Sequence, residues 1–101
     1  MPAKQWTTRK TSFLIPRRRD DVVLDELDTE ASLFDPRSGD TYHLNQTARA
    51  VWTRCDGSCT ARQVAREMTK AYEVTWHVAL DHVEQLVSMF ASSGLLEATE
   101  S

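Results

Sequence analysis

The chain has 101 residues, of which 41% are hydrophobic, and this composition suits one globular domain with a core of modest size. No stretch approaches the roughly 18 consecutive apolar residues of a membrane-spanning helix, and the N-terminus has no apolar signal-peptide core, so we expect a cytoplasmic protein. Two cysteines are too few for a disulfide framework.

The net charge of −3 is unevenly distributed along the chain. Residues 1–19 contain six Lys or Arg and no acidic residue, whereas residues 20–101 contain fifteen acidic and six basic residues. We therefore predict a basic, flexible N-terminal arm over residues 1–19, dispensable for folding, and one domain over residues 20–98. The acidity of that domain disfavours nucleic acid as a partner, because phosphates would be repelled.

Three short stretches before the middle of the chain have the composition of β-strands. They are residues 22–27, 31–35 and 41–44. In the second stretch, Leu33 and Phe34 are expected to point to opposite faces, and Pro36 to Gly39 form a turn in which Pro fixes φ and Gly tolerates a positive φ. Tight connections cannot form parallel crossovers, so the pattern predicts an antiparallel meander.

A first helix is expected directly after the third strand. Asn45 suits its N-cap, because the side chain can accept from the free amides of the first turn, and Thr47 is the weaker alternative. The apolar face at spacings of three and four residues consists of Ala48, Val51, Trp52 and Cys55. Gly57 is expected at or near the position that follows the helix C-cap.

Two further amphipathic helices are expected in the second half. Thr60 and Gln63 have the spacing of a capping box, and Thr75 is the expected cap of the last helix, which ends before Gly94. Tyr72 continues the apolar stripe of the middle helix and is expected in the core. The predicted fold class is α+β and winged-helix-like, with a three-stranded antiparallel sheet followed by a three-helix bundle.

Three motifs, taken in order and spacing, resemble the PqqD-like proteins, which are also described as RiPP recognition elements. They are LNQTA at residues 44–48 before Val51 and Trp52, DG at 56–57 before the helix VAREM at 64–68, and GLLE at 94–97. The resemblance covers residues 21–97. Family members bind the leader segment of a ribosomally made precursor peptide and present it to a modifying enzyme, often a radical SAM enzyme.

The resemblance implies that the leader adds as a strand beside residues 41–44, in a groove closed by the last helix. The expected peptide-binding residues are Thr41, Tyr42, His43 and Leu44 on the strand, and His82, Gln85, Leu86 and Met89 on the helix. The four helix residues lie three and four positions apart and so form one stripe. An unpaired strand edge is a liability unless a partner covers it, which agrees with this binding mode.

Catalytic and metal-binding patterns are missing from the sequence. Cys55 and Cys59 form a C-x3-C pair without a second pair of ligands, and His77 and His82 are too poorly spaced to complete a zinc site. The sequence has no nucleophile elbow and no phosphate-binding glycine loop. We therefore expect a binding protein that is not an enzyme and has no cofactor. The oligomeric state is left open.

The alternative function is that of a DNA-binding winged helix, since three helices and a small sheet suit that use too. A recognition helix needs Arg, Lys, Asn or Gln on its exposed face. The last helix has no Lys or Arg, and the middle helix offers Arg62, Arg66 and Lys70. Trp52, Tyr72 and Trp76 could form a ligand cage, but Trp52 and Tyr72 lie on the core stripes and are expected to serve core packing. Trp76 opens the last helix and is freer to be exposed.

Overall fold

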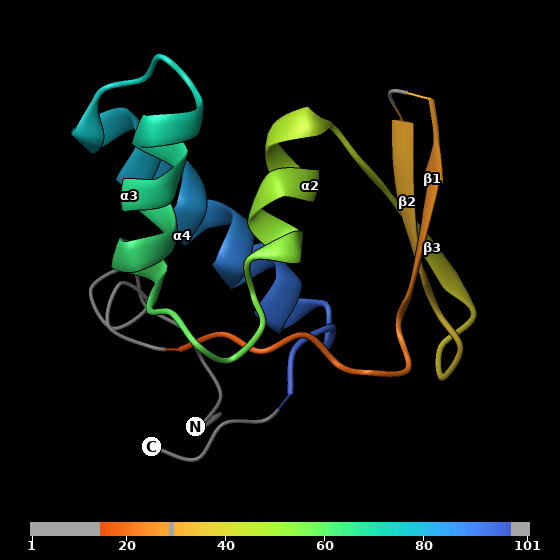
Figure 1. Ribbon diagram of the computed structural model, residues 1–101. Coiled ribbons are helices and arrows are strands. Elements are labelled where there is room, and N and C mark those ends of the chain that lie inside the picture. Colours follow the sequence, from red (N-terminus) through yellow and green to blue (C-terminus); the bar gives the residue numbers. More distant parts are fainter. Residues whose placement is uncertain (1–14, 29, 98–101) are drawn as a thin grey trace.

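The computed structural model describes residues 15–28 and 30–97, and Figure 1 shows a small sheet at one end of the molecule and helices at the other. The strands are β1 (Val23–Leu27), β2 (Glu30–Asp35) and β3 (Asp40–Leu44), and the helices are α2 (Gln46–Thr53), α3 (Ala61–Ala71) and α4 (Trp76–Ser92). This order confirms the predicted α+β fold, an antiparallel sheet followed by three helices. Residues 1–14, most of the predicted arm, and the predicted domain end at residue 98 lie outside the described residues.

The sheet has the strand order β1-β2-β3, with antiparallel pairing on each side of β2. Leu24, Leu33 and Tyr42 stand opposite one another and face the helices, as their burial shows. The neighbouring row, to which Phe34 belongs, lies on the outer face, so Leu33 is fully buried and Phe34 is 41% exposed. The predicted opposite orientation of Leu33 and Phe34 is confirmed.

The three helix starts follow the capping signals of the sequence. The Asn45 side chain accepts a hydrogen bond from the amide of Ala48 at 2.8 Å, so Asn45 and not Thr47 is the cap. Thr60 and Gln63 form the reciprocal capping box, at 3.1 and 2.7 Å. Thr75 caps α4 without such a box, because only its side chain takes part, accepting from the amide of Val78 at 3.4 Å. These bonds satisfy amides that a helix cannot pair internally.

The end of α4 is a Schellman motif. Gly94 has φ +76°, which favours glycine, and its amide donates to the carbonyl of Ala91 at 3.0 Å. The amide of Leu95 donates to the carbonyl of Phe90 at 2.9 Å, and the Leu95 side chain is 1% exposed. The chain therefore turns back under the helices at this glycine and closes the core.

Two expectations about helix ends are wrong. Helix α2 ends at Thr53 with Arg54 as its cap, so Gly57 lies beyond the C′ position, although Cys55 is buried as expected. Helix α3 ends at Ala71, and Tyr72 is its extended C-cap. Tyr72 therefore leaves the helical stripe and is 37% exposed instead of lying in the core.

The core lies between the inner face of the sheet and the buried faces of α2, α3 and α4. Trp52 is 2% exposed and Phe90 is fully buried, and their rings pack edge to face with 5.1 Å between centroids and 75° between planes. This geometry matches the favoured arrangement of aromatic quadrupoles. Trp76, by contrast, is half-buried at the start of α4.

The assignment of residues 17–19 to a flexible arm needs correction, because this segment is hydrogen-bonded into the domain. Arg18 donates its amide to the carbonyl of Cys55 at 2.8 Å, and Arg19 donates to Leu95 at 3.0 Å. The amide of Glu97 donates to the carbonyl of Arg17 at 2.7 Å. Figure 1 shows the segment running along the lower edge of the molecule toward the sheet. A run of basic side chains does not prevent this pairing, because backbone hydrogen bonds do not depend on side-chain charge.

Arg19 is the only basic side chain of the described residues that is buried, and all five guanidinium N–H donors have acceptors. Two donate to the Asp35 carboxylate at 2.9 and 3.1 Å, and two donate to Asp21 at 2.7 and 3.0 Å. The fifth donates to the carbonyl of Gly94 at 2.7 Å. These bonds raise the pKa of Arg19, and the guanidinium lowers the pKa of Asp35 to about 2. The Arg19 side chain thus connects three parts of the fold: the segment before β1, the end of β2 and the turn after α4.

These contacts change what the arm deletion is expected to show. Removal of residues 1–14 is expected to leave a cooperative thermal unfolding transition, because every bond of residues 16–19 is retained. Removal of residues 1–19 is expected to lower the melting temperature by more than 10 °C or to abolish the transition, since at least 3 kcal/mol is lost. Circular dichroism melts of the two truncated chains make the test. Equal melting temperatures would show that the segment contributes nothing to stability.

Candidate functional site

One edge of β3 has no strand partner among the described residues. The sheet order places β3 at an edge, with β2 on its other side. Successive amides of a strand point to alternate sides, so half of the backbone groups of β3 are directed to the open edge. This edge offers hydrogen bonds that an extended chain can accept and donate.

A groove with a volume of about 440 Å³ opens where β3 passes into α2 and faces α4. Its lining residues are Asn45, Thr47, His82, Gln85, Leu86 and Met89. The side chain of Gln85 donates to Asp81 one turn earlier at 2.9 Å, which orients it along the rim. Met89 is 41% exposed although it is apolar. The groove thus combines an apolar part with polar hydrogen-bonding side chains.

The structure brings together the four helix residues that were predicted for the site, His82, Gln85, Leu86 and Met89. The four strand residues do not line the groove with their side chains. Leu44 is buried in the core and Tyr42 packs partly against it, while Thr41 and His43 are exposed on the outer face. Only the backbone of β3 is therefore available beside the groove.

Sequence reasoning missed Asn45 and Thr47 as lining residues. The capping signal placed Asn45 correctly at the start of α2, and the strand pattern placed it at the end of β3. What brings it to the groove is the packing of α4 against this junction. No local pattern encodes that contact.

The outer face of the sheet carries a Ser–His pair. The hydroxyl oxygen of Ser32 lies 3.3 Å from Nδ1 of His43, and Asp25 pairs with Ser32 from the other side in the strand register. A catalytic relay needs the carboxylate beside the histidine, where it orients the imidazole. Here the order is Asp–Ser–His, so this row lacks that arrangement.

Cys55 lacks the surroundings of a reactive thiol. Cys55 is fully buried and its thiol donates to the carbonyl of Val51 at 3.2 Å. Burial raises the pKa of this thiol to about 12, which keeps it protonated.

Within residues 15–28 and 30–97, no cluster of three or more His, Cys, Asp or Glu side chains is arranged to hold a metal ion. Nor does this part of the chain contain a helix with the length and apolarity needed to cross a membrane.

The family described as coenzyme PQQ synthesis protein D (PqqD) matches residues 30–96, about two thirds of the sequence. The chain belongs to the PqqD family. The match runs from β2 to the end of the folded core, so it includes both β3 and α4. No curated protein matched the sequence significantly.

Solved structures share the architecture of this PqqD-family chain. A lasso peptide synthetase B1 complexed with its leader peptide is 27% identical, with a TM-score of 0.73 over 84% of this chain and 100% of the other. The PqqD truncation of Methylobacterium extorquens PqqCD, described as a functional, stand-alone RiPP recognition element, is 26% identical, with a TM-score of 0.67 over 87% of this chain and 97% of the other. TbiB1 in complex with the TbiA(β) leader peptide is 18% identical, with a TM-score of 0.73 over 84% of this chain and 99% of the other. At this identity the likeness supports the fold alone.

Proposed function

We propose that this protein is a leader-peptide-binding module that captures a ribosomally synthesised precursor by strand addition and presents it to a modifying enzyme. The observation that carries the proposal is the open edge of β3 beside a groove formed with α4. Membership of the PqqD family supports it, as does the likeness to a lasso peptide synthetase B1 complexed with a leader peptide. The module itself catalyses no step in this proposal.

The edge and the groove have different tasks. Backbone bonds along β3 hold any extended chain, and each contributes on the order of 1 kcal/mol net. The groove distinguishes sequences, because a leader side chain must bury apolar surface on Leu86 and Met89 and find partners among Asn45, His82 and Gln85. We propose that these groups, with the backbone of residues 41–44, form the binding site. A cytoplasmic location follows from the proposal, because the precursor is made there.

A substitution in the groove tests the second task. Met89→Ala is expected to weaken leader binding about tenfold, because contact between the peptide and this side chain is worth roughly 1–2 kcal/mol. Val78→Ala is the matched control, since Val78 is an equally exposed apolar residue of α4 outside the groove. Isothermal titration calorimetry, with the leader of a precursor encoded near this protein, measures the dissociation constant of each variant. Equal weakening by the two substitutions would contradict the groove assignment.

Strand addition has a signature of its own. Methylation of single backbone nitrogens in the leader peptide is expected to weaken binding at every second position, because alternate amides of an added strand face β3. Chemical-shift mapping on the labelled protein should move the amides of residues 41–44 and of α4. Shifts confined to α3 around Arg62 and Arg66, with residues 41–44 unmoved, would show that strand addition is wrong.

Proline substitutions identify the open edge. Thr41→Pro and Tyr42→Pro remove amides that point to opposite sides of β3. One variant is expected to lose a β2–β3 ladder bond and melt earlier, and the other to keep its melting temperature and bind the leader several-fold more weakly. The two measurements together assign the amide positions. Two variants that both bind the leader normally would exclude β3 from the site.

A further inference from the structure

Helix α3 presents a basic stripe to solvent. Arg62, Arg66 and Lys70 are four residues apart, so they lie along one face, opposite the buried Val64, Ala65 and Met68. Arg66 and Lys70 are exposed, and Arg62 is half-buried. None of the ion pairs seen within residues 15–28 and 30–97 involves Arg66 or Lys70.

Trp76 from the start of α4 packs against this stripe. The guanidinium carbons of Arg62 and Arg66 lie 5.3 and 5.7 Å from the centroid of its ring. Cation–π contacts at these distances hold a guanidinium in place without neutralising its charge. A planar guanidinium that stacks on a ring can still direct N–H donors at a carboxylate. The stripe is therefore a partly ordered cationic surface with an aromatic component.

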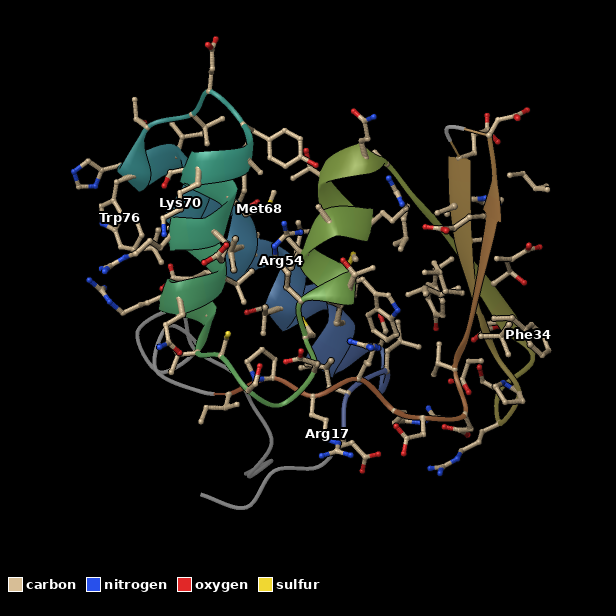
Figure 2. All side chains as sticks on the ribbon, in the orientation of Figure 1. Arg17, Phe34, Arg54, Met68, Lys70 and Trp76 are labelled. Atoms are coloured by element: carbon tan, nitrogen blue, oxygen red, sulfur yellow. The ribbon has the colours of Figure 1, made fainter. Side chains whose placement is uncertain are left out.

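The basic stripe and the groove lie on different parts of the molecule. Figure 1 shows α3 at the end opposite the sheet, with α2 and α4 between them. In Figure 2, Lys70 and Trp76 lie at this end and Phe34 at the sheet end. The groove belongs to the β3–α2 junction and to the part of α4 from His82 onward. A partner on the stripe would therefore leave the groove accessible.

The sheet and α3 carry opposite net charges. Residues 20–44, which contain the sheet, include eight acidic residues and one basic residue, Arg37. Residues 61–71, the span of α3, include three basic residues and one acidic residue, Glu67. An approaching anionic surface is attracted to α3 and repelled from the sheet, which fixes its orientation.

We infer that the α3 stripe with Trp76 is a docking surface for an acidic face of a partner protein, whose carboxylates pair with Arg66 and Lys70. The position of the stripe lets the partner dock while a leader occupies the groove. Only the identification of this partner as the modifying enzyme rests on the proposed function. Nucleic acid fits less well, because three cations fall short of the roughly 6–10 phosphate contacts of DNA-binding proteins and the sheet repels phosphates.

The probe for this surface is a helical peptide with three Glu residues spaced four apart, titrated into the labelled full-length chain at low ionic strength. The α3 amides and the indole N–H of Trp76 are expected to shift. Arg66→Gln with Lys70→Gln should weaken binding about fivefold, from two exposed charge pairs. The matched control, Arg17→Gln with Arg37→Gln, removes the same charge outside the stripe and is expected to leave the affinity unchanged. No shift on α3, or equal weakening by both double variants, would overturn the inference.

A charge swap makes the test specific. The double variant Arg66→Glu with Lys70→Glu is expected to show no binding of the Glu peptide. It is expected to bind a peptide of the same sequence in which Lys replaces each Glu. A DNA duplex of about 20 base pairs that displaces the Glu peptide at a lower concentration than the peptide itself would assign the surface to nucleic acid instead. Because no leader is present, failure of this test would leave the groove proposal intact, and failure of leader binding at residues 41–44 would leave this surface intact.

Discussion

Replacement of Arg19 by methionine is expected to lower the free energy of unfolding by about 3 kcal/mol, because it leaves the buried Asp35 carboxylate without its cation. The Arg19 side chain is 9% exposed and that of Asp35 is 5% exposed, so water cannot replace the lost bonds. The carbonyl of Gly94 loses its donor as well. Urea unfolding monitored by circular dichroism measures the effect.

Arg37 provides the matched control for this substitution. Its side chain is 72% exposed and it pairs with Asp21, which also accepts from Arg19. Arg37→Met removes the same charge, but an exposed pair contributes only about 0–1 kcal/mol. The double variant Arg19→Met with Asp35→Leu is expected to be more stable than Arg19→Met alone, since no unpaired carboxylate remains. Equal losses in the two single variants would show that burial of the pair is unimportant.

The same pair predicts how stability depends on pH. The folded-state pKa of Asp35 is lowered from 3.8 to about 2 by the hydrogen bonds from Arg19, so its contribution is present above pH 3.8 and is lost as the pH falls toward 2. In Arg19→Met this dependence should reverse, because protonation then relieves an unpaired buried charge. The difference in stability between the two proteins is therefore expected to shrink already above pH 4, where Asp35 of the variant takes up its proton, and to shrink further toward pH 2, where the wild-type carboxylate is protonated.

Truncation of Trp52 to alanine is expected to cost about 3–5 kcal/mol, the range for removal of a large buried aromatic side chain. Trp52 is 2% exposed, and its ring packs edge to face on Phe90, so the truncation leaves a cavity between α2 and α4. The expected fall in melting temperature exceeds 10 °C for a domain of this size. Differential scanning calorimetry measures it.

Trp76→Ala is the appropriate comparison, because it removes the same atoms from a half-buried position. Its cost is expected to be clearly smaller, since a solvent-facing site leaves little cavity. A shift of only a degree or two for Trp52→Ala would contradict the burial of its ring. Such a result would favour a role for Trp52 in a ligand-binding surface.

Local chemistry in the sequence was sufficient to locate the main elements. The helix starts could be predicted from their N-cap residues, Asn45, Thr60 and Thr75. A cap side chain pairs with an amide no more than three residues away, so the signal lies within neighbouring residues of the sequence. The α4 stripe that lines the groove was also predictable, because residues three and four apart share a helix face whatever surrounds the helix. The family resemblance then indicated which face to consider.

Tertiary structure alone decided the features that join distant parts of the chain. Arg19 looked like one cation in a basic run, yet beside the neighbouring Asp21 it has two distant partners, Asp35 sixteen residues away and Gly94 75 residues away. Tyr72 fitted a helical stripe, but the backbone leaves the helix at that residue, so its side chain is exposed. Asn45 reaches the groove only because α4 packs beside the end of β3. The sequence thus determined periodicity and caps, which depend on neighbours within a few residues, whereas burial and pairing depend on which segments the fold brings together.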